Sequence, residues 1–162
     1  MKIYNKTKIN NQMKNLQNFT EFINEGVNFN KQETGEDWIK EYGEGYDGEN
    51  ETQIERFDVS AKDLKTNLKN LIWADEYFDG ESEEGNLFYQ GMKQLFSSGK
   101  EIHSDGGGFG RTYTGKVKNV PVVQFEEQGY DAYYFDKKNG KKLSKIINKA
   151  IADGEITASG DY

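Results

Sequence analysis

The sequence predicts an α+β fold, in which N-terminal helices precede a three-stranded antiparallel meander and a C-terminal amphipathic helix. Apolar residues recur at helical spacing in several segments before residue 99. Between 109 and 136, apolar and polar residues alternate, as in strands with one buried face. A chain of 162 residues is typical of one domain. We therefore expect an arm with a short amphipathic helix over 1–32, a single domain over 33–157 and a tail over 158–162.

The first half of the chain is predicted to be mostly helical. Residues 13–25 carry apolar side chains at helical spacing, whereas the glycines between 35 and 48 favour a loop. Residues 54–59 are compatible with an extended stretch, and the leucines after them predict a helix over 61–73. Ser82 is a candidate N-cap for one more helix, which a Ser-Ser-Gly segment should end.

The second half is predicted to form strands and one helix. Three strands are expected over 109–117, 120–126 and 130–136, with short turns between them. Because Pro121 has no N–H to donate, its strand is an edge strand or is paired on only one side at that point. The clearest amphipathic stripe lies at 143–151 and predicts the C-terminal helix. One shared core is expected to bury Leu64, Leu68, Leu71, Phe88, Met92, Leu95, Val122, Phe125, Phe135, Leu143, Ile146, Ile147 and Ile151.

Composition limits the chemistry that the protein can perform. The formal net charge is −7, hydrophobic residues make up 34% and aromatic residues 14%, so we expect a small core rich in rings. The chain has no cysteine, which excludes disulfides, thiolate catalysis and zinc–thiolate sites. It has a single histidine and no apolar segment of the roughly 20 residues that a membrane helix needs. We therefore expect no metal, no cofactor and no membrane span.

The acidic residues concentrate in the first half of the chain, while both ends are basic. Asp47 and the acids after it lack the ligand order of a calcium loop. One interpretation is that these acids are solvated loop charges that keep the protein soluble. The other is that the fold gathers them onto one face, which imitates a phosphate backbone and attracts a basic protein by long-range electrostatics. The candidate surface comprises Glu36, Asp37, Glu41, Glu44, Asp47, Glu49, Glu51, Asp79, Glu81, Glu83 and Glu84.

Three other patterns bear on chemistry. Residues 110–117 read GRTYTGKV and resemble a phosphate-binding loop, but Val117 replaces the hydroxyl residue and a strand is expected to follow, which favours a plain strand. His103 with Asp105 could act as a general base, although a solvated loop histidine is the simpler interpretation. Six lysines around the last helix favour a solvated helix face over a phosphate-binding surface.

The segment at 13–25 reads MKNLQNFTEFINE and resembles the leader peptides of proteins packaged inside the heads of large tailed bacteriophages. Those leaders follow the pattern M-K-x-x-x-x-F-x-x-F-I-x-E, and a maturation protease cuts them after Leu or Ile, any residue, and then Glu. The resemblance implies that Ile23 and Glu25 form the cleavage motif and that Gly26 begins the mature chain. It also implies that the leader docks on the head scaffold through Lys14, Phe19, Phe22 and Ile23.

Together these observations lead to the hypothesis of a small acidic, non-enzymatic bacteriophage accessory protein that acts by protein–protein contact, in the virion or in the host cytoplasm. Its most specific form inhibits a host defence or nucleic-acid-handling protein. The expected partner is then a basic nucleic-acid-binding protein, with no direct contact to nucleic acid or membrane. Two alternatives remain: a generic bacterial α+β interaction module with no catalytic role, and a small hydrolase or transferase that uses His103.

Overall fold

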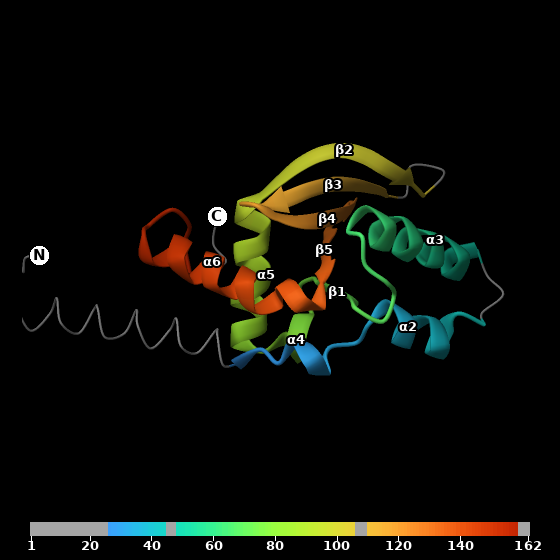
Figure 1. Cartoon of the computed structure of the whole chain (residues 1–162), viewed down its shortest axis with the longest axis horizontal. Helices are drawn as coiled ribbons and strands as arrows, with labels where there is room; N and C mark the ends of the chain where they lie inside the picture. The colour runs from blue at the N-terminus through green and yellow to red at the C-terminus, as the bar shows by residue number, and fades with distance from the viewer. Residues whose placement is uncertain (1–25, 45–47, 106–109, 159–162) are drawn as a thin grey trace, which may run out of the picture.

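The computed structural model describes residues 26–44, 48–105 and 110–158 (Figure 1). The strands are β1 (Leu71–Ala74), β2 (Phe96–Ser104), β3 (Arg111–Val117), β4 (Val120–Glu127) and β5 (Tyr130–Asp136). They form one antiparallel sheet with the order β1-β5-β4-β3-β2. The α+β class is confirmed, and the three expected strands are β3, β4 and β5. The prediction of a three-stranded sheet is wrong, because β1 and β2 extend the meander at its two edges.

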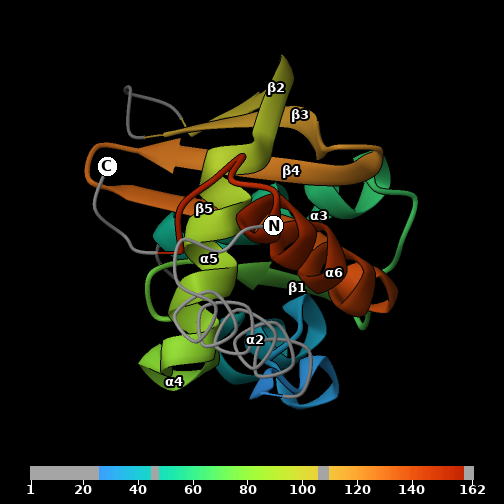
Figure 2. The same cartoon turned by 90° about the vertical axis from the view of Figure 1, so that its left-hand side faces the viewer.

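Helices cover both faces of this sheet (Figure 1, Figure 2). The helical segments are η1 (Phe29–Lys31), α2 (Gly35–Tyr42), α3 (Gly48–Asp63), α4 (Phe78–Glu81), α5 (Glu83–Leu95), η2 (Lys137–Asn139) and α6 (Gly140–Ala152). Successive side chains of β5 point to opposite faces of the sheet. Tyr133 and Phe135 lie in the core under α5 and α6. Ala132 and Tyr134 point the other way, into the core under α2 and α3. The sheet therefore separates two cores.

The layer of α5 and α6 follows the sequence prediction closely. Ser82 caps α5 by accepting a hydrogen bond from the N–H of Gly85, and α6 covers the whole predicted stripe. The two helices approach each other closely at Gly91, where an added Cβ would lie 2.5 Å from Cγ2 of Ile147. Val27 and Phe29 close this core from the N-terminal side.

The expected core residues divide between the two faces rather than forming one core. On the α5–α6 face, the fully buried members are Phe88, Met92, Val122, Phe135, Leu143 and Ile147. Leu71 and Phe125 are buried on the opposite face. The remaining members are only partly buried: Leu64, Leu68, Leu95, Ile146 and Ile151.

The region before β1 differs most from the prediction. Residues 35–42 form α2 instead of a loop, because Thr34 and Asp37 make a reciprocal capping box at its start. Residues 54–59 are helical instead of extended. Ile54, Phe57 and Ala61 lie at helical spacing along α3. Their spacing fits the observed helix, although glycines precede this segment.

The helix predicted over 61–73 is also wrong, since α3 ends at Asp63 and Leu71 begins β1. Lys65 has a φ of 56° and occupies the left-handed position that glycine usually takes after a helix. The N–H of Thr66 donates to the carbonyl of Ala61, and that of Lys65 donates to Lys62, as in a Schellman motif. A lysine in this position leaves no sequence signal for the helix end.

Strand β2 follows α5 without any intervening loop. The predicted end of the helix is confirmed, but the Ser-Ser-Gly segment continues directly as strand. β2 is largely exposed and shifts register twice against β3, so it shows no regular alternation. Pro121 pairs with Lys116 of β3, whereas pairing with β5 begins at Val123, so Pro121 is paired on one side as expected.

Candidate functional site

The acidic residues named from the sequence are distributed mainly over four helices, α2, α3, α4 and α5. Glu36, Asp37 and Glu41 belong to α2, Glu44 follows it, and Glu51 is exposed near the start of α3. Asp79 and Glu81 lie in α4, while Glu83 and Glu84 begin α5, where acids suit the helix dipole. Asp47 and the side chain of Glu49 lie outside the described residues.

Several of these acids have local structural partners. Asp37 accepts the N–H of Thr34 at 3.0 Å, and the hydrogen bonds with Thr34 lower the pKa of Asp37. Glu36 pairs with Lys40 at 3.2 Å one helical turn away. Asp79 accepts hydrogen bonds from Nε2 of Gln32 at 2.9 Å and from Oγ of Ser82 at 2.7 Å. These contacts organise the helix starts and the turn at α4.

A hollow between α2, α3 and the edge of the sheet collects aromatic and acidic side chains. Its volume is about 430 Å³, and we call it the α2–α3 groove. Five of its lining residues are aromatic, two are carboxylates and two are amides, and none of those described is cationic. The lining residues are Glu33, Trp38, Tyr42, Asn50, Gln53, Trp73, Asp75, Tyr130 and Tyr134.

The groove continues toward α4. A second hollow of about 230 Å³ shares Glu33, Trp73 and Asp75 with the first and also contacts Asp79. Burial and the charges of Glu41 and Asp37 raise the pKa of Glu33, so the acids of α2 act on the groove itself. Glu33, just before α2, and Asp75, just after β1, therefore both lie at this groove, and Glu41 and Asp37 of α2 act on Glu33.

The buried ring of Phe57 packs against three of the aromatic side chains that line the groove. Its side chain is fully buried, and its ring centroid lies 5.4 Å from Trp38, 5.2 Å from Trp73 and 5.9 Å from Tyr134. Tyr42, whose ring lies 5.2 Å from Trp38, remains 46% exposed at the rim. The rings are thus held from the core and open toward solvent on one side.

The polar groups of the groove are largely engaged with one another. Oδ2 of Asp75 accepts the hydroxyl of Tyr130 at 2.6 Å, and Oδ1 of Asp75 accepts the N–H of Tyr77 at 2.8 Å. Burial, together with the hydrogen bond to Asp75, raises the pKa of Tyr130. The hydroxyl of Tyr130 therefore stays protonated and acts as a donor. Nδ2 of Asn50 donates to the carbonyl of Tyr42 at 2.7 Å.

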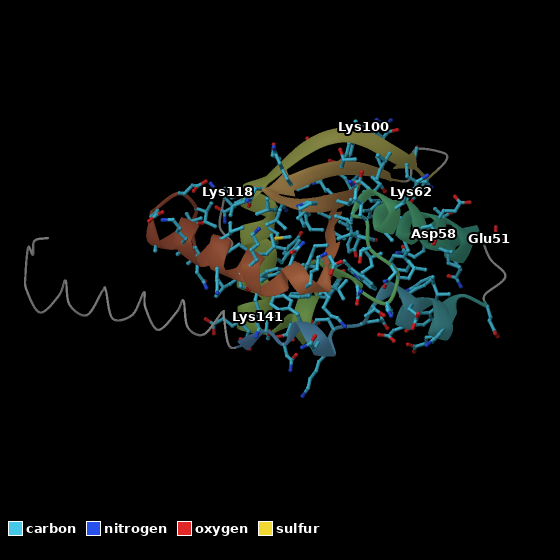
Figure 3. All side chains as sticks on the ribbon, in the orientation of Figure 1. Glu51, Asp58, Lys62, Lys100, Lys118 and Lys141 are labelled. Atoms are coloured by element: carbon cyan, nitrogen blue, oxygen red, sulfur yellow. The ribbon has the colours of Figure 1, made fainter. Side chains whose placement is uncertain are left out.

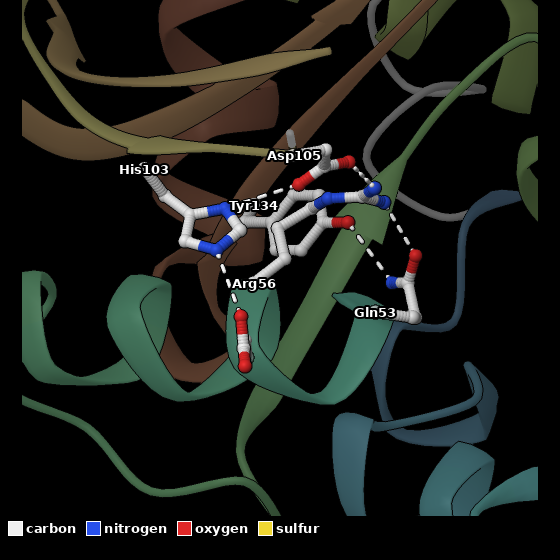
Figure 4. Close-up of polar contacts among 6 residues, drawn as sticks. Gln53, Arg56, His103, Asp105 and Tyr134 are labelled. Atoms are coloured by element: carbon white, nitrogen blue, oxygen red, sulfur yellow. Dashed lines mark hydrogen bonds and ion pairs between the residues drawn. The ribbon is translucent and has the colours of Figure 1, made fainter. Parts of the chain in front are cut away.

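Behind the groove lies a second polar arrangement, the Arg56 cluster, which comprises Gln53, Glu55, Arg56, His103, Asp105 and Tyr134 (Figure 4). The guanidinium of Arg56 lies 3.4 Å above the ring of Phe125 and donates to Oδ2 of Asp105. Arg56 also donates to Gln53, whose Nε2 donates to the hydroxyl of Tyr134 at 3.3 Å. Gln53 and Tyr134 therefore connect the cluster to the groove.

His103 and Asp105, singled out from the sequence, are brought together in this cluster. Nδ1 of His103 lies 3.1 Å from Oδ1 of Asp105, and Nε2 lies 3.3 Å from Oε2 of Glu55 (Figure 4). The ring thus faces a carboxylate on each side and joins α3 to β2. His103 lines neither hollow of the groove. The simpler interpretation, a loop histidine in solvent, is wrong, because the side chain lies in β2 and is 14% exposed.

The remaining sequence motifs lie outside the groove. Residues 110–117 run into β3, which turns directly into β4, so the strand interpretation of GRTYTGKV is confirmed. The lysines of α6 are exposed, and Figure 3 shows Lys141 below the middle of the molecule and Glu51 at its right-hand end. Among the described residues, no group of three side chains is placed to hold a metal ion. None of the described helices has the length and apolar character needed to cross a membrane.

Of the expected cleavage residues, Ile23 and Glu25 lie outside the described part of the chain. Gly26 packs against Glu84, since a Cβ added to Gly26 would lie 2.7 Å from Cγ of that side chain. Within the described part of the chain, the α5–α6 core already includes Val27, which precedes the domain boundary expected after residue 32. Apart from residue 158, the expected tail lies outside the described residues.

No family model matches the chain, and no curated protein or solved structure matches it. The groove is therefore the feature from which a function is inferred. Sequence reasoning missed its aromatic members, although a signal was present. Both tryptophans stand beside acids in the sequence, Trp38 directly after Asp37 and Trp73 two residues before Asp75.

Proposed function

We propose that this protein is a small, non-enzymatic binding protein that acts by contact with a basic protein partner. The observation that carries the proposal is the α2–α3 groove, where Glu33 and Asp75 join five aromatic rings with no cationic residue in the described lining. Asp37 and Glu41 add negative charge next to Glu33. Charge of one sign beside a hollow steers oppositely charged partners toward it.

The Arg56 cluster favours binding over catalysis. A general base needs a ring nitrogen within reach of a substrate proton. Nδ1 of His103 is buried, Nε2 faces Glu55 of this chain, and His103 lines neither hollow of the groove. We assign the cluster to fastening α3 against the sheet, which holds one wall of the groove in place.

The resemblance of residues 13–25 to phage head leaders supports a phage setting for this activity. In that setting a basic nucleic-acid-binding protein of the host is the proposed partner. Packaging is tested by the intact mass of the protein recovered from virions of the phage that encodes it. We expect a chain beginning at Gly26, and full-length chain in mature particles would overturn the packaging proposal.

The binding proposal is tested by capturing host proteins on the immobilised full chain and quantifying them by mass spectrometry. The capture is carried out at about 0.1 M and at about 1 M salt, where the Debye screening lengths are about 10 Å and about 3 Å. The test variant is Glu41→Lys with Glu44→Lys, two exposed acids beside the groove. The matched control is Glu126→Lys with Glu127→Lys, two exposed acids at the end of β4, which changes the net charge equally.

We expect specific proteins that bind the wild type and the control variant but not the test variant, and that dissociate at the higher salt concentration. The test acids are exposed, so their reversal should leave the unfolding transition unchanged. A set of bound proteins that responds to neither salt nor reversal would overturn the proposal. Equal loss with both variants would show an effect of net charge alone and would also overturn it.

A further inference from the structure

The α2–α3 groove combines two groups that attract organic cations. An aromatic face attracts a cation placed within about 6 Å of its centroid, and a carboxylate adds a direct charge partner. Trp38 and Trp73 supply ring faces, while Glu33 and Asp75 supply carboxylates at the same hollow. Burial and neighbouring acids already disfavour the charged form of Glu33, so an incoming cation would relieve repulsion there.

The chain contains an occupied example of the same arrangement. The guanidinium of Arg56 lies 3.4 Å above the Phe125 ring and bonds to Asp105. Ring, guanidinium and carboxylate thus form one buried unit in the Arg56 cluster. The groove shares Gln53 and Tyr134 with this cluster and presents rings and carboxylates, and its described lining contains no cation.

Aromatic rings with amides and carboxylates also suit a neutral sugar, but the hydrogen bonds argue against one. Asn50 donates to a backbone carbonyl, and Gln53 donates to Tyr134 and accepts from Arg56. The Tyr130 hydroxyl donates to Asp75. A sugar would need these polar groups for its hydroxyls, whereas a cation needs only the ring faces and the negative charge.

We infer that the α2–α3 groove receives an arginine side chain of the partner protein. The inference rests on the proposed function and specifies which side chain of the partner the groove recognises. A guanidinium is planar and weakly hydrated, so it stacks on a ring while its N–H groups reach carboxylates, which an ammonium group does less well. Glu33 and Asp75 are the expected charge partners, and Trp38 and Tyr42 the expected stacking partners.

The groove carries its own reporter, because Trp38 and Trp73 are the two tryptophans of the chain and both line it. Tryptophan fluorescence of the full chain is titrated with end-blocked glycine pentapeptides that carry arginine, lysine or citrulline at the centre. Citrulline keeps the shape of arginine but has no charge. We expect a saturable change with the arginine peptide, a weaker one with lysine and none with citrulline.

Two variants test the groove residues, each with a matched control. Glu33→Gln removes one charge from the groove, and Glu126→Gln removes one from an exposed position on β4. Tyr42→Ala removes an exposed ring from the rim, and Tyr113→Ala removes a half-buried ring from β3. We expect Glu33→Gln and Tyr42→Ala each to weaken arginine binding about two- to fivefold. The control variants should bind as the wild type does.

Equal binding of the citrulline peptide, or of lysine and arginine, would overturn the inference, because guanidinium recognition would then be absent. A fluorescence response to a neutral oligosaccharide with no response to arginine would overturn it in favour of a sugar site. Different outcomes would overturn the proposal of a basic partner and the proposal that the groove binds arginine. If Glu41→Lys with Glu44→Lys abolishes capture of partners but the arginine peptide does not bind, the protein binds by its acidic surface and the groove assignment is wrong.

Discussion

The two faces of the sheet are built from different chemistry. Under α5 and α6, the core consists of aliphatic, phenylalanine and tyrosine side chains together with Met92. Under α2 and α3, rings share the space with a buried Arg56–Asp105 pair, and the same layer opens into the α2–α3 groove. The first face stabilises the fold by burying apolar surface. The second combines stability with a charged, accessible site, so changes there should affect folding and binding through different residues.

The largest effect on stability is expected from breaking the buried ion pair. Arg56→Met leaves Asp105 as a buried carboxylate without its cation, and such single truncations destabilise by about 3–5 kcal/mol. Chemical denaturation measures the loss. Arg56→Met with Asp105→Leu removes both charges and should recover most of that stability, because a buried pair is close to neutral against apolar residues of similar size. Equal stability of the single and double variants would contradict this account of the α2–α3 face.

On the opposite face, the corresponding test is an apolar truncation. Ile147 is fully buried between α5 and the sheet, and Ile147→Ala should cost about 2–5 kcal/mol. Its neighbour Ile146 is only partly buried, so Ile146→Ala should cost less and serves as the control. A loss below about 1 kcal/mol for Ile147→Ala would mean that the packing of this face is not as described.

The contrast between the faces also explains which elements the sequence could predict. α5 and α6 carry regular apolar stripes, and Ser82 caps the start of α5 as expected, so local pattern and final packing agree. The strands β3 to β5 were predictable from the two-residue turns between them, although both faces of β5 are buried. By contrast, β1 follows a helix end formed by Lys65, and its four residues are almost wholly buried. A short buried strand has no alternation to distinguish it from a helix.

Only part of the candidate site could be predicted from the sequence. His103 and Asp105 are two residues apart and could be paired from the sequence, but Glu55 lies on another element, and only the packing of α3 on β2 brings it to His103. The groove likewise joins side chains from α2, α3, β1 and β5. The acids of α2 could be listed, whereas the rings beside them depend on tertiary contacts that no local pattern records.

A smaller effect is expected from the start of α2, which forms one wall of the groove. Thr34 accepts the N–H of Asp37 at 3.1 Å and is itself buried. Thr34→Ala removes this cap and should destabilise the protein by about 1 kcal/mol, while Thr34→Ser, which keeps the hydroxyl, should lose less. Denaturation measures the stability, and tryptophan fluorescence reports whether Trp38 moves with the helix. A Thr34→Ala variant as stable as the wild type would show that the cap is dispensable.

The smallest effect concerns pH, and the two acids around this cap should respond in opposite directions. Hydrogen bonds with Thr34 lower the pKa of Asp37, so its contribution to stability is complete above the unfolded pKa, near 3.8, and is lost as pH falls through the folded value. Burial and nearby acids raise the pKa of Glu33. Its contribution is therefore complete below the unfolded value, near 4.5, and is lost as pH rises through the folded value.

Denaturation midpoints between about pH 3 and about pH 7 separate the two groups, because this range spans the ordinary carboxyl pKa values. Asp37→Asn should lose stability at neutral pH and flatten the decline of stability in acid. Glu33→Gln should be at least as stable as the wild type at neutral pH, since a charge held beside Glu41 and Asp37 has been removed, while its arginine binding weakens. That combination, in which stability is kept and binding is weakened, is what a residue of the binding site should show. A Glu33→Gln variant that loses stability at neutral pH would instead place Glu33 among the residues that hold the fold together.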